Sequence, residues 1–254
     1  MIYKDYLTKA HGLLALECSC LPGDFLKSEN VLTVSRPQSG GRVYLPRKPF
    51  FHMVTFGGNA VITADACMQP FLRAHMENKL GHWLFEIPNL LPVQRELEKH
   101  GRTLSQMHHI FLPDKEIAVP EDRPVKWFYG EDLASFRTDP RFPNAMEAMD
   151  APPGTESPLK MAVCAYDGDQ IMGMAGCAED APNWYQIGID VLPEYRSRGV
   201  GTYLVALMKN KIIRQGGIPY YISSAAGYHS WNIALACGFK PAWAEISAEG
   251  STSM

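Results

Sequence analysis

The stretch that most constrains the fold of this chain is a run of apolar segments between residues 159 and 208. Two of these segments are joined by the sequence DGDQ, whose Asp-Gly pair supplies the positive φ that a tight β-turn requires. A third segment, IGIDV, alternates apolar with polar or small residues and indicates another strand. The next segment has helical apolar spacing, and Gly216 and Gly217 end it. A hairpin, a strand and a helix in this order predict an α/β fold.

The flanking segments continue this alternation of helices and strands. We expect further elements at about 2–17 (helix), 50–56 (strand), 65–79 and 90–100 (helices), 103–113 (strand), 218–223 (strand), 229–238 (helix) and 239–247 (strand). Three prolines and six charged residues interrupt the apolar pattern at 113–124, which indicates a linker. The sequence therefore predicts an N-terminal α/β domain at 1–112 and a C-terminal domain at 125–254.

Composition and charge narrow the class of protein. Of the 254 residues, 46% are hydrophobic and 20% charged, which is typical of a folded globular protein. The net charge of −3 argues against nucleic acid as a partner. The N-terminus lacks the apolar core of a signal peptide, and no later stretch reaches the length of a membrane span. We expect a cytoplasmic protein without a membrane partner, and the sequence leaves its oligomeric state open.

The cysteines and histidines give no metal-binding pattern. The six cysteines are expected to be reduced thiols, and the one close pair, Cys18 and Cys20, does not have zinc-site spacing. The adjacent His108 and His109 should point to opposite faces of a strand. We therefore expect no metal site.

The sequence PEYRSRGVGTYL, residues 193–204, indicates an anion site at a helix start. The first turn of a helix has amides without intrahelical partners and a partial positive charge, so it attracts phosphate. Gly199 and Gly201 would let a diphosphate approach these amides, Thr202 adds a hydroxyl, and Arg196 and Arg198 add positive charge. The P-loop and the dinucleotide fingerprint are excluded, because the lysine and the third glycine that they need are missing. The alternative is that the glycines only form a strand-to-helix turn.

The pattern Val191-x-Pro193-x-x-Arg196-x-x-Gly199-x-Gly201 resembles the acyl-CoA signature of the GNAT superfamily of N-acetyltransferases. Gly238-Phe239, after the short helix, is a second mark of that family, and the order of elements over about 125–248 is similar to its fold. The resemblance implies a mixed central sheet of the GNAT type in the C-terminal half. The smaller N-terminal domain then either shapes the acceptor pocket or is a degenerate copy of the same fold.

The resemblance also implies which residues hold the co-substrate acetyl-CoA. The pyrophosphate cradle would comprise Arg196, Ser197, Arg198, Gly199, Val200, Gly201 and Thr202. Backbone groups of Ile189 and Val191 would hold the pantetheine arm in a space between their strand and the strand near 218–222, and would polarise the thioester carbonyl. The asparagine that many members carry before the short helix corresponds to Gly227 here, so Asn232, later on that helix, is a candidate contact beside a structural role.

The catalytic residues of the family are not matched. The glutamate that often acts as general base corresponds to Tyr185; the other candidates are Glu179, Asp180 and Asp190, and Asp190 has the alternative role of tying down a neighbouring helix. The usual tyrosine acid corresponds to Ala234, and Tyr228, His229 and Ser230 are the possible substitutes. Tyr185, Asp190 and His229 are therefore the candidate catalytic residues, with His229 suited to proton transfer by its ordinary pKa.

Two functions follow from this pattern. The first is an N-acetyltransferase that uses acetyl-CoA, without a metal, to acetylate a primary amine of a small molecule or peptide. The alternative is an acyl-CoA-binding sensor or interaction module without turnover, which the two missing catalytic residues favour.

Overall fold

The computed structural model describes residues 2–120, 123–136, 138–146 and 159–250. The chain forms two compact units, which are described separately below. Unit 1 comprises Met1–Tyr6 and Phe111–Lys240, and unit 2 comprises Leu7–Ile110 and Pro241–Met254.

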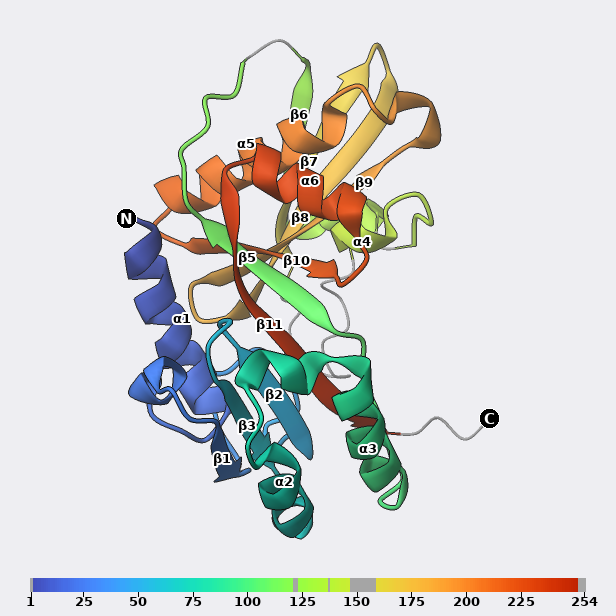
Figure 1. Ribbon diagram of the computed structural model, residues 1–254. Helices are drawn as coiled ribbons and strands as arrows, with labels where there is room; N and C mark the ends of the chain where they lie inside the picture. Colours follow the sequence, from blue (N-terminus) through green and yellow to red (C-terminus); the bar gives the residue numbers. More distant parts are fainter. Residues whose placement is uncertain (1, 121–122, 137, 147–158, 251–254) are drawn as a thin grey trace. The chain divides into compact units, whose positions relative to one another are not determined.

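The sheet of unit 1 is mixed (Figure 1). Its strands lie in the order β5 (His108–Pro113), β10 (Ile218–Ser224), β9 (Trp184–Val191), β8 (Gln170–Ala181), β7 (Leu159–Asp167) and β6 (Val125–Tyr129). Strands β6 to β9 are antiparallel neighbours, whereas β10 is parallel to β9. The predicted hairpin is confirmed as β7 and β8, and Gly168 in its turn has the expected positive φ of 57°.

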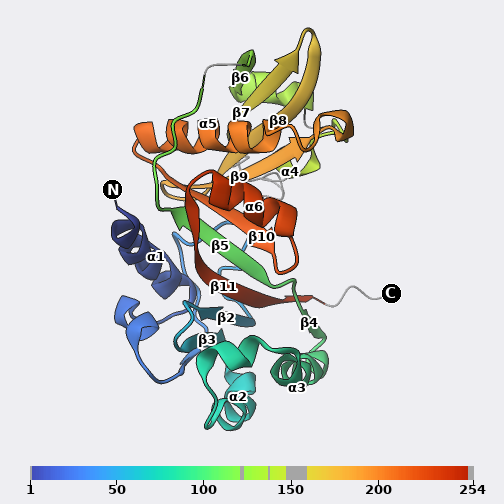
Figure 2. The ribbon, with the colours of Figure 1, turned by 45° about the horizontal axis from the view of Figure 1, so that its top comes forward.

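Helices cover both faces of this sheet. Helix α5 (Val200–Arg214) contacts β7, β8, β9 and β10, and α6 (Tyr228–Ala236) contacts α5 and β10 (Figure 2). On the opposite face lies the short α4 (Pro143–Met146), which sits so close to the sheet that a Cβ on Gly188 would be 1.9 Å from the carbonyl oxygen of Asn144. The predicted helix at about 200 and its glycine end are confirmed, since Gly216 follows α5 with a φ of 83°.

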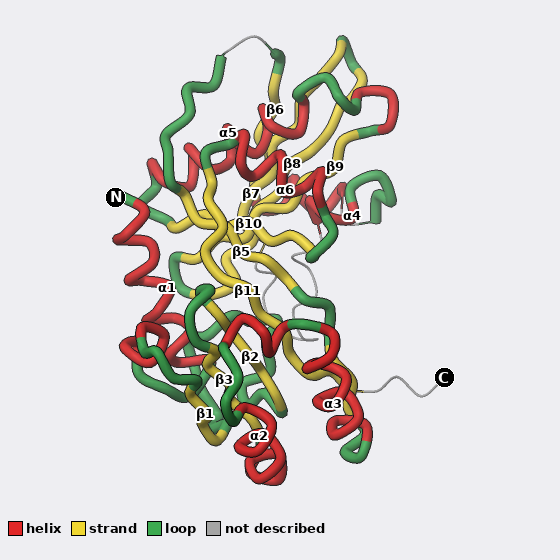
Figure 3. The backbone as a smooth tube through the Cα atoms, viewed as in Figure 1, coloured by secondary structure: helices red, strands yellow, loops and turns green. Residues whose placement is uncertain are grey.

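The strands of unit 2 carry helices on both faces (Figure 3). Its strands lie in the order β1 (Val31–Val34), β3 (Ala60–Ala64), β2 (Phe51–Thr55) and β11 (Phe239–Gly250), and β4 (Arg102–Leu104) also pairs with β11. Helices α2 (Gln69–Met76) and α3 (Ile87–Glu98) pack on an apolar core that includes Phe51, Ile62 and Ile246. The end of α1 (Tyr3–Glu17) lies on the other face, where Thr33 Oγ1 donates to Cys18 O.

Short 3₁₀ helices connect several of these elements. They are η1 (Pro22–Leu26), η2 (Ala66–Met68), η3 (Gly81–Phe85), η4 (Gly130–Phe136) and η6 (Pro193–Tyr195). The sequence missed β1 and α4, which are only four residues long and therefore too short for a periodic signal.

The units divide the chain differently from the predicted domains 1–112 and 125–254. Residues from Pro241 onward group with unit 2, because β11 makes its ladder with β2 over Ala244–Ser247 and with β4 over Ala248–Gly250. The expected linker at 113–124 belongs to unit 1 and is fixed to it: Lys209 Nζ donates to Lys115 O (2.7 Å), and Asn210 Nδ2 donates to Ile117 O (3.0 Å).

Candidate functional site

The loop between β9 and α5 has an unusual backbone. Ser197 and Gly199 adopt positive φ values of 59° and 75°, and α5 begins at the next residue, Val200. Only glycine adopts this conformation without a steric cost, which explains why Gly199 stands directly before the helix. A Cβ at Gly199 would meet only Arg123 Nη2, 3.8 Å away, so the space beside the helix start is open.

The first turn of α5 leaves its amides unpaired. In the described part of the chain, the amides of Val200, Gly201 and Thr202 donate to no protein group, and the first amide to bond back is that of Tyr203, to Gly199 O (3.0 Å). No side chain caps this helix. Three amides and the helix dipole therefore converge where an anion would be stabilised.

The second glycine of the motif has a packing role. A Cβ at Gly201 would lie 3.0 Å from Ile233 Cδ1 and 3.4 Å from Val191 Cγ2, so the glycine allows α5 to approach α6 and β9 closely. The expectation that both glycines open the amides to a ligand thus fits the surroundings of Gly199, whereas Gly201 positions the helix itself.

Three arginines surround this loop. Arg196 Nε donates to Val191 O (3.2 Å), and the guanidinium of Arg198 lies 5.6 Å from the centre of the Tyr195 ring. Arg123, which sequence reasoning missed, donates from Nη2 to Arg198 O (2.8 Å). Its position in a charged, proline-rich stretch gave no signal that it would lie beside Gly199.

Strands β9 and β10 separate toward this loop. Their parallel register pairs Ile218 with Trp184 and continues to Tyr221 opposite Ile187, where it ends. Residues 188–191 of β9 and 222–224 of β10 remain strand but are not paired with each other. We call this segment the β9–β10 divergence.

Hydrogen-bonding groups of β9 face the divergence. Asn183 O accepts from Ile218 N on the β10 side (2.8 Å), whereas Leu192 N donates to Met172 O on the β8 side (3.0 Å). Because these groups alternate along a strand, the amides and carbonyls of Ile189 and Val191 point toward β10, where the pairing has ended. The two residues named from the sequence therefore present backbone groups to the diverging segment.

Asp190 holds α4. Its two carboxylate oxygens accept hydrogen bonds from Asn144 Nδ2 and from the amide of Ala145 (2.7 Å). These contacts match the alternative role considered for Asp190, that of tying down a neighbouring helix.

Tyr185 lies in the paired part of β9. It is opposite Pro219 in β10 and Glu179 in β8, three residues before the divergence begins, and its ring packs on Gly217. Burial and the nearby Glu179 carboxylate raise the pKa of its phenol. The structure therefore does not bring Tyr185 together with Val191 and the glycine loop.

Asp180 is also occupied by a neighbour. Its buried carboxylate accepts a hydrogen bond from Tyr220 Oη (2.6 Å), on the strand that forms the other side of the divergence.

The start of α6 carries the remaining candidates. His229 and Asn232 are exposed, Tyr228 is 71% exposed, and Ala234 is fully buried. Ser230 Oγ donates to the phenol oxygen of Tyr221 (2.8 Å), which is buried at the last paired position of β10. The sequence missed Tyr221, because one of two adjacent tyrosines in an apolar strand is more simply explained as core packing.

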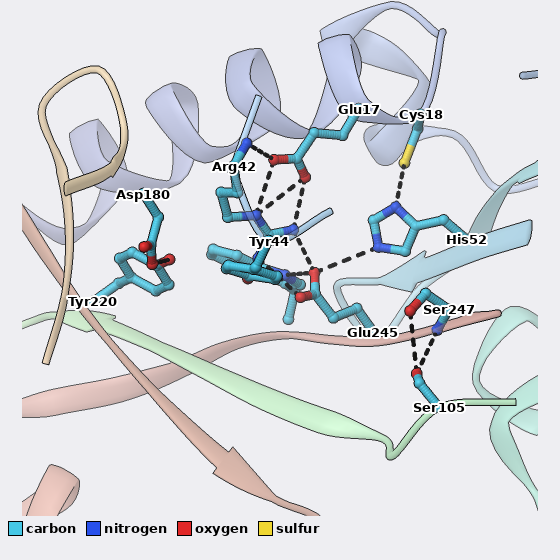
Figure 4. A network of polar contacts seen from close by, with 11 residues as sticks. Glu17, Cys18, Arg42, Tyr44, His52, Ser105, Asp180, Tyr220, Glu245 and Ser247 are labelled. Atoms are coloured by element: carbon cyan, nitrogen blue, oxygen red, sulfur yellow. Dashed lines mark hydrogen bonds and ion pairs between the residues drawn. The ribbon is translucent and has the colours of Figure 1, made fainter. Parts of the chain in front are cut away.

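Unit 2 contains a cluster of buried charges, Glu17, Arg42 and Glu245 (Figure 4). Arg42 Nη2 lies 2.7 Å from a carboxylate oxygen of each glutamate. Burial opposes the ionisation of Arg42 and Glu245, but the two carboxylates raise the pKa of Arg42, and Arg42 lowers the pKa of Glu245 well below its usual range. The sequence gave no sign of this cluster, because Arg42 and Glu245 are 203 residues apart.

His52 extends this cluster toward Cys18. His52 Nε2 lies 3.6 Å from Glu245 Oε2, and Nδ1 lies 3.8 Å from Cys18 Sγ. Burial raises the pKa of Cys18 well above its usual value. The described residues include no group of three or more His, Cys, Asp or Glu side chains arranged to hold a metal ion. None of the described helices combines the length and the apolar character that crossing a membrane requires.

Comparison with known proteins gives a family for part of the chain. Residues 122–239 match the model of the acetyltransferase (GNAT) family. No curated protein matches the chain.

Several solved structures are similar to this chain, and the sequence identity, coverage and TM-score of three of them follow. A GCN5-related N-acetyltransferase-like protein from Streptococcus suis is 13% identical over 65% of this chain and 68% of its own, with a TM-score of 0.48. A GCN5-related N-acetyltransferase from Kribbella flavida is 16% identical over 62% and 63%, with a TM-score of 0.44. A Drosophila protein is 14% identical over 97% and 89%, with a TM-score of 0.45.

Proposed function

Residues 122–239 of this chain form a GNAT acetyltransferase domain, and from that premise we propose that the protein transfers an acetyl group from acetyl-CoA to a primary amine by direct attack. The observation that carries the proposal is the β9–β10 divergence together with the unpaired first turn of α5. The divergence offers backbone groups to the extended pantetheine arm, and the first turn of α5 offers amides to the diphosphate.

The residues at the loop fit a CoA thioester. Ser197, Gly199, Val200, Gly201 and Thr202 would surround the pyrophosphate, with Arg196, Arg198 and Arg123 supplying positive charge. Each hydrogen bond from an amide to a charged oxygen contributes about 1.5–3 kcal/mol, so three amides supply a substantial affinity. The open space beside Gly199 supports this assignment, since a Cβ there would meet no backbone. Asn232 is an exposed candidate contact on α6.

Ile189 and Val191 would hold the pantetheine arm by their backbone. Their amides and carbonyls point toward β10, whose pairing with β9 has ended, and of these groups the Val191 carbonyl accepts a hydrogen bond from Arg196 Nε (3.2 Å). A fixed amide at this point also stabilises the negative charge that develops on the thioester oxygen during attack. The role needs no particular side chain, which agrees with the apolar residues present.

Proton removal from the amine is assigned to solvent. A lysine-like ammonium has a pKa of about 10.4, so freeing its lone pair at pH 7 costs about 4–5 kcal/mol. Asp190 holds α4 and Asp180 accepts a hydrogen bond from Tyr220, so these two carboxylates are engaged in structural contacts. Tyr185 lies in the paired part of β9, three residues before the divergence, and His229 remains an exposed candidate for carrying the proton away. We therefore expect kcat/KM to rise with pH toward the pKa of the acceptor amine.

Thiol release from acetyl-CoA tests the proposal. The purified full chain is incubated with acetyl-CoA and a panel of amines comprising polyamines, aminoglycosides, amino acids and lysine peptides, while free CoA thiol is measured. We expect release that depends on at least one amine. Tight acetyl-CoA binding by calorimetry without release over any amine would instead support the non-catalytic acyl-CoA-binding module.

A further inference from the structure

The departing sulfur of acetyl-CoA has no evident proton donor on α6. The family position for a tyrosine is Ala234, which is fully buried and has no acidic proton. Tyr228 and His229 precede it by one and a half turns, and both side chains are exposed. A donor near the sulfur therefore has to come from another element that borders the β9–β10 divergence.

Tyr221 lies where β9 and β10 separate. It is the last residue of β10 with a partner in β9, Ile187, and the unpaired segment begins immediately after this pair. Residues opposite each other in adjacent strands share a face, so the Tyr221 ring lies on the same face as Ile187, toward α5 and α6. An arm that enters at Gly199 and follows Val191 and Ile189 would end at this position.

Ser230 orients the phenol. Ser230 Oγ, in the first turn of α6, donates to Tyr221 Oη over 2.8 Å. The phenol oxygen is thus an acceptor in this contact, and its own proton remains available to a further acceptor. Ser230 lies four residues, about one helical turn, before Ala234 on α6, so the phenol from β10 reaches the helix one turn before the position where the family has its tyrosine.

The protonation state of Tyr221 suits a donor. Burial raises the pKa of its phenol to about 12, with Ser230 opposing the rise and the charge of Asp190 adding to it. The phenol therefore keeps its proton at neutral pH. After donation, the hydrogen bond from Ser230 stabilises the phenolate.

We propose that Tyr221 is the general acid that protonates the CoA sulfur, with Ser230 as its positioning residue, an inference that rests on the acetyltransferase function proposed above. The amine nitrogen forms the C–N bond, the C–S bond breaks, and the electron pair stays on sulfur. The proton of Tyr221 Oη moves to that sulfur, the proton lost by the amine goes to solvent, and solvent reprotonates the phenolate. The products are the acetamide and CoA thiol.

Tyr221→Phe is the first test, since it removes only the hydroxyl. We expect acetyl-CoA affinity by calorimetry to change less than threefold and kcat to fall about 100-fold or more, the contribution typical of general acid catalysis. Tyr166→Phe, in β7, is the matched control and should leave both unchanged. A Tyr221→Phe variant with wild-type kcat would overturn the assignment.

A second acetyl donor tests whether Tyr221 donates a proton to the leaving group or only shapes the site. In acetyl-seleno-CoA the leaving selenol is more acidic than a thiol and needs no proton in the transition state. We expect the kcat defect of Tyr221→Phe to shrink at least tenfold with this donor. An equal defect with both donors would mean that Tyr221 shapes the site without donating a proton, and would overturn the proposal.

Two further measurements guard against indirect effects. Burial raises the pKa of both Tyr3 and Tyr221 to about 12, so a spectrophotometric titration of Tyr221→Phe should show one fewer tyrosine ionising near pH 12 than that of the wild type. Should Tyr221→Phe fail to fold, Ser230→Ala takes its place, with kcat expected to fall about tenfold and to recover with the selenium donor; wild-type behaviour of Ser230→Ala would overturn the pairing. If the wild type itself transfers no acetyl group, the proposed function fails, whereas an active wild type with an active Tyr221→Phe refutes only the role of Tyr221.

Discussion

Each unit contains a pair of parallel strands, and the two pairs end differently. In unit 2, all four residues of β1 have partners in β3, from Val31 opposite Val61 to Val34 opposite Ala64. In unit 1, only four of the eight residues of β9 have partners in β10. In the proposed function, the pantetheine arm needs strands that continue after their pairing has stopped, which β9 and β10 offer and β1 and β3 do not.

The polar groups of the two units follow the same contrast. Unit 2 surrounds the buried guanidinium of Arg42 with carboxylates of Glu17 and Glu245, so its charges satisfy one another. Among the described residues, unit 1 leaves the first amides of α5 and the backbone groups of Ile189 without protein partners, whereas the Val191 carbonyl accepts from Arg196 Nε. A closed polar cluster stabilises a fold, whereas unsatisfied groups at a surface favour a ligand.

The largest expected effect is a loss of stability when the buried cluster of Glu17, Arg42 and Glu245 is disrupted. Arg42→Ala leaves two buried carboxylates without their cation, and removing one partner of a buried ion pair typically destabilises by about 3–5 kcal/mol. Urea unfolding followed by circular dichroism should show this loss. Arg47→Ala, at an exposed position, is the control and should stay within about 0.5 kcal/mol of the wild type. Equal stability of the two variants would contradict the role given to Arg42.

The second effect concerns the open helix start. Gly199→Leu places a side chain over the unpaired amides, and we expect acetyl-CoA affinity to fall about 100-fold, which corresponds to about 2.7 kcal/mol. Gly216→Leu is a close control, because Gly216 also has a positive φ with open space around its Cβ but lies after the other end of α5. Both variants should lose similar stability from backbone strain. Calorimetric titration separates them, and similar affinities would contradict the phosphate cradle.

The third effect distinguishes the two roles of Asp190. Asp190→Asn keeps at most one of the two hydrogen bonds to α4, so the free energy of unfolding should fall by about 1–3 kcal/mol. Acetyl transfer should persist within a few-fold at temperatures where the variant is folded. Asp169→Asn, in the exposed hairpin turn, serves as the control. A loss of kcat by several orders of magnitude in a stable Asp190→Asn protein would instead identify a general base.

The smallest effect is the loss, at acidic pH, of the stability that the Glu245 carboxylate contributes. Because folding lowers the pKa of this carboxylate, its contribution to stability is present above the pKa of the unfolded chain, about 4.3, and is lost as pH falls below it. Between pH 7 and pH 3.5 this loss amounts to about 1 kcal/mol. Glu245→Gln should be less stable at pH 7 yet lose about that much less on acidification. Parallel curves for the two proteins would contradict the lowered pKa.

The sequence predicted the parts of unit 1 that depend on local chemistry. Asp167-Gly168 predicted the hairpin turn, and the helical spacing of apolar residues predicted α5. Gly199, with its positive φ, stands directly before that helix. Ile189 and Val191 were named through the resemblance to the GNAT family, and both lie in β9 beyond its last partner in β10.

The remaining features depend on pairings between distant segments. Arg123 reaches the loop across 75 residues, and Asp190 meets Asn144 across 46. The sequence around Tyr221 is that of a core strand, and only the contact of its hydroxyl with Ser230 distinguishes it from a packing residue. Such contacts leave no periodic trace, so composition and spacing predicted the scaffold better than the side chains around it.

Unit 2 is formed by two chain segments that are synthesised at different times. Its helices and all of its strands except β11 are encoded before residue 111, whereas Glu245 and the β11 ladder are encoded after residue 238. A nascent chain that has released only its first 110 residues holds Arg42 with a single carboxylate partner. The first half of the protein therefore cannot complete its charge cluster until residue 245 has been made, and a premature stop near residue 240 would remove part of the unit that was synthesised first.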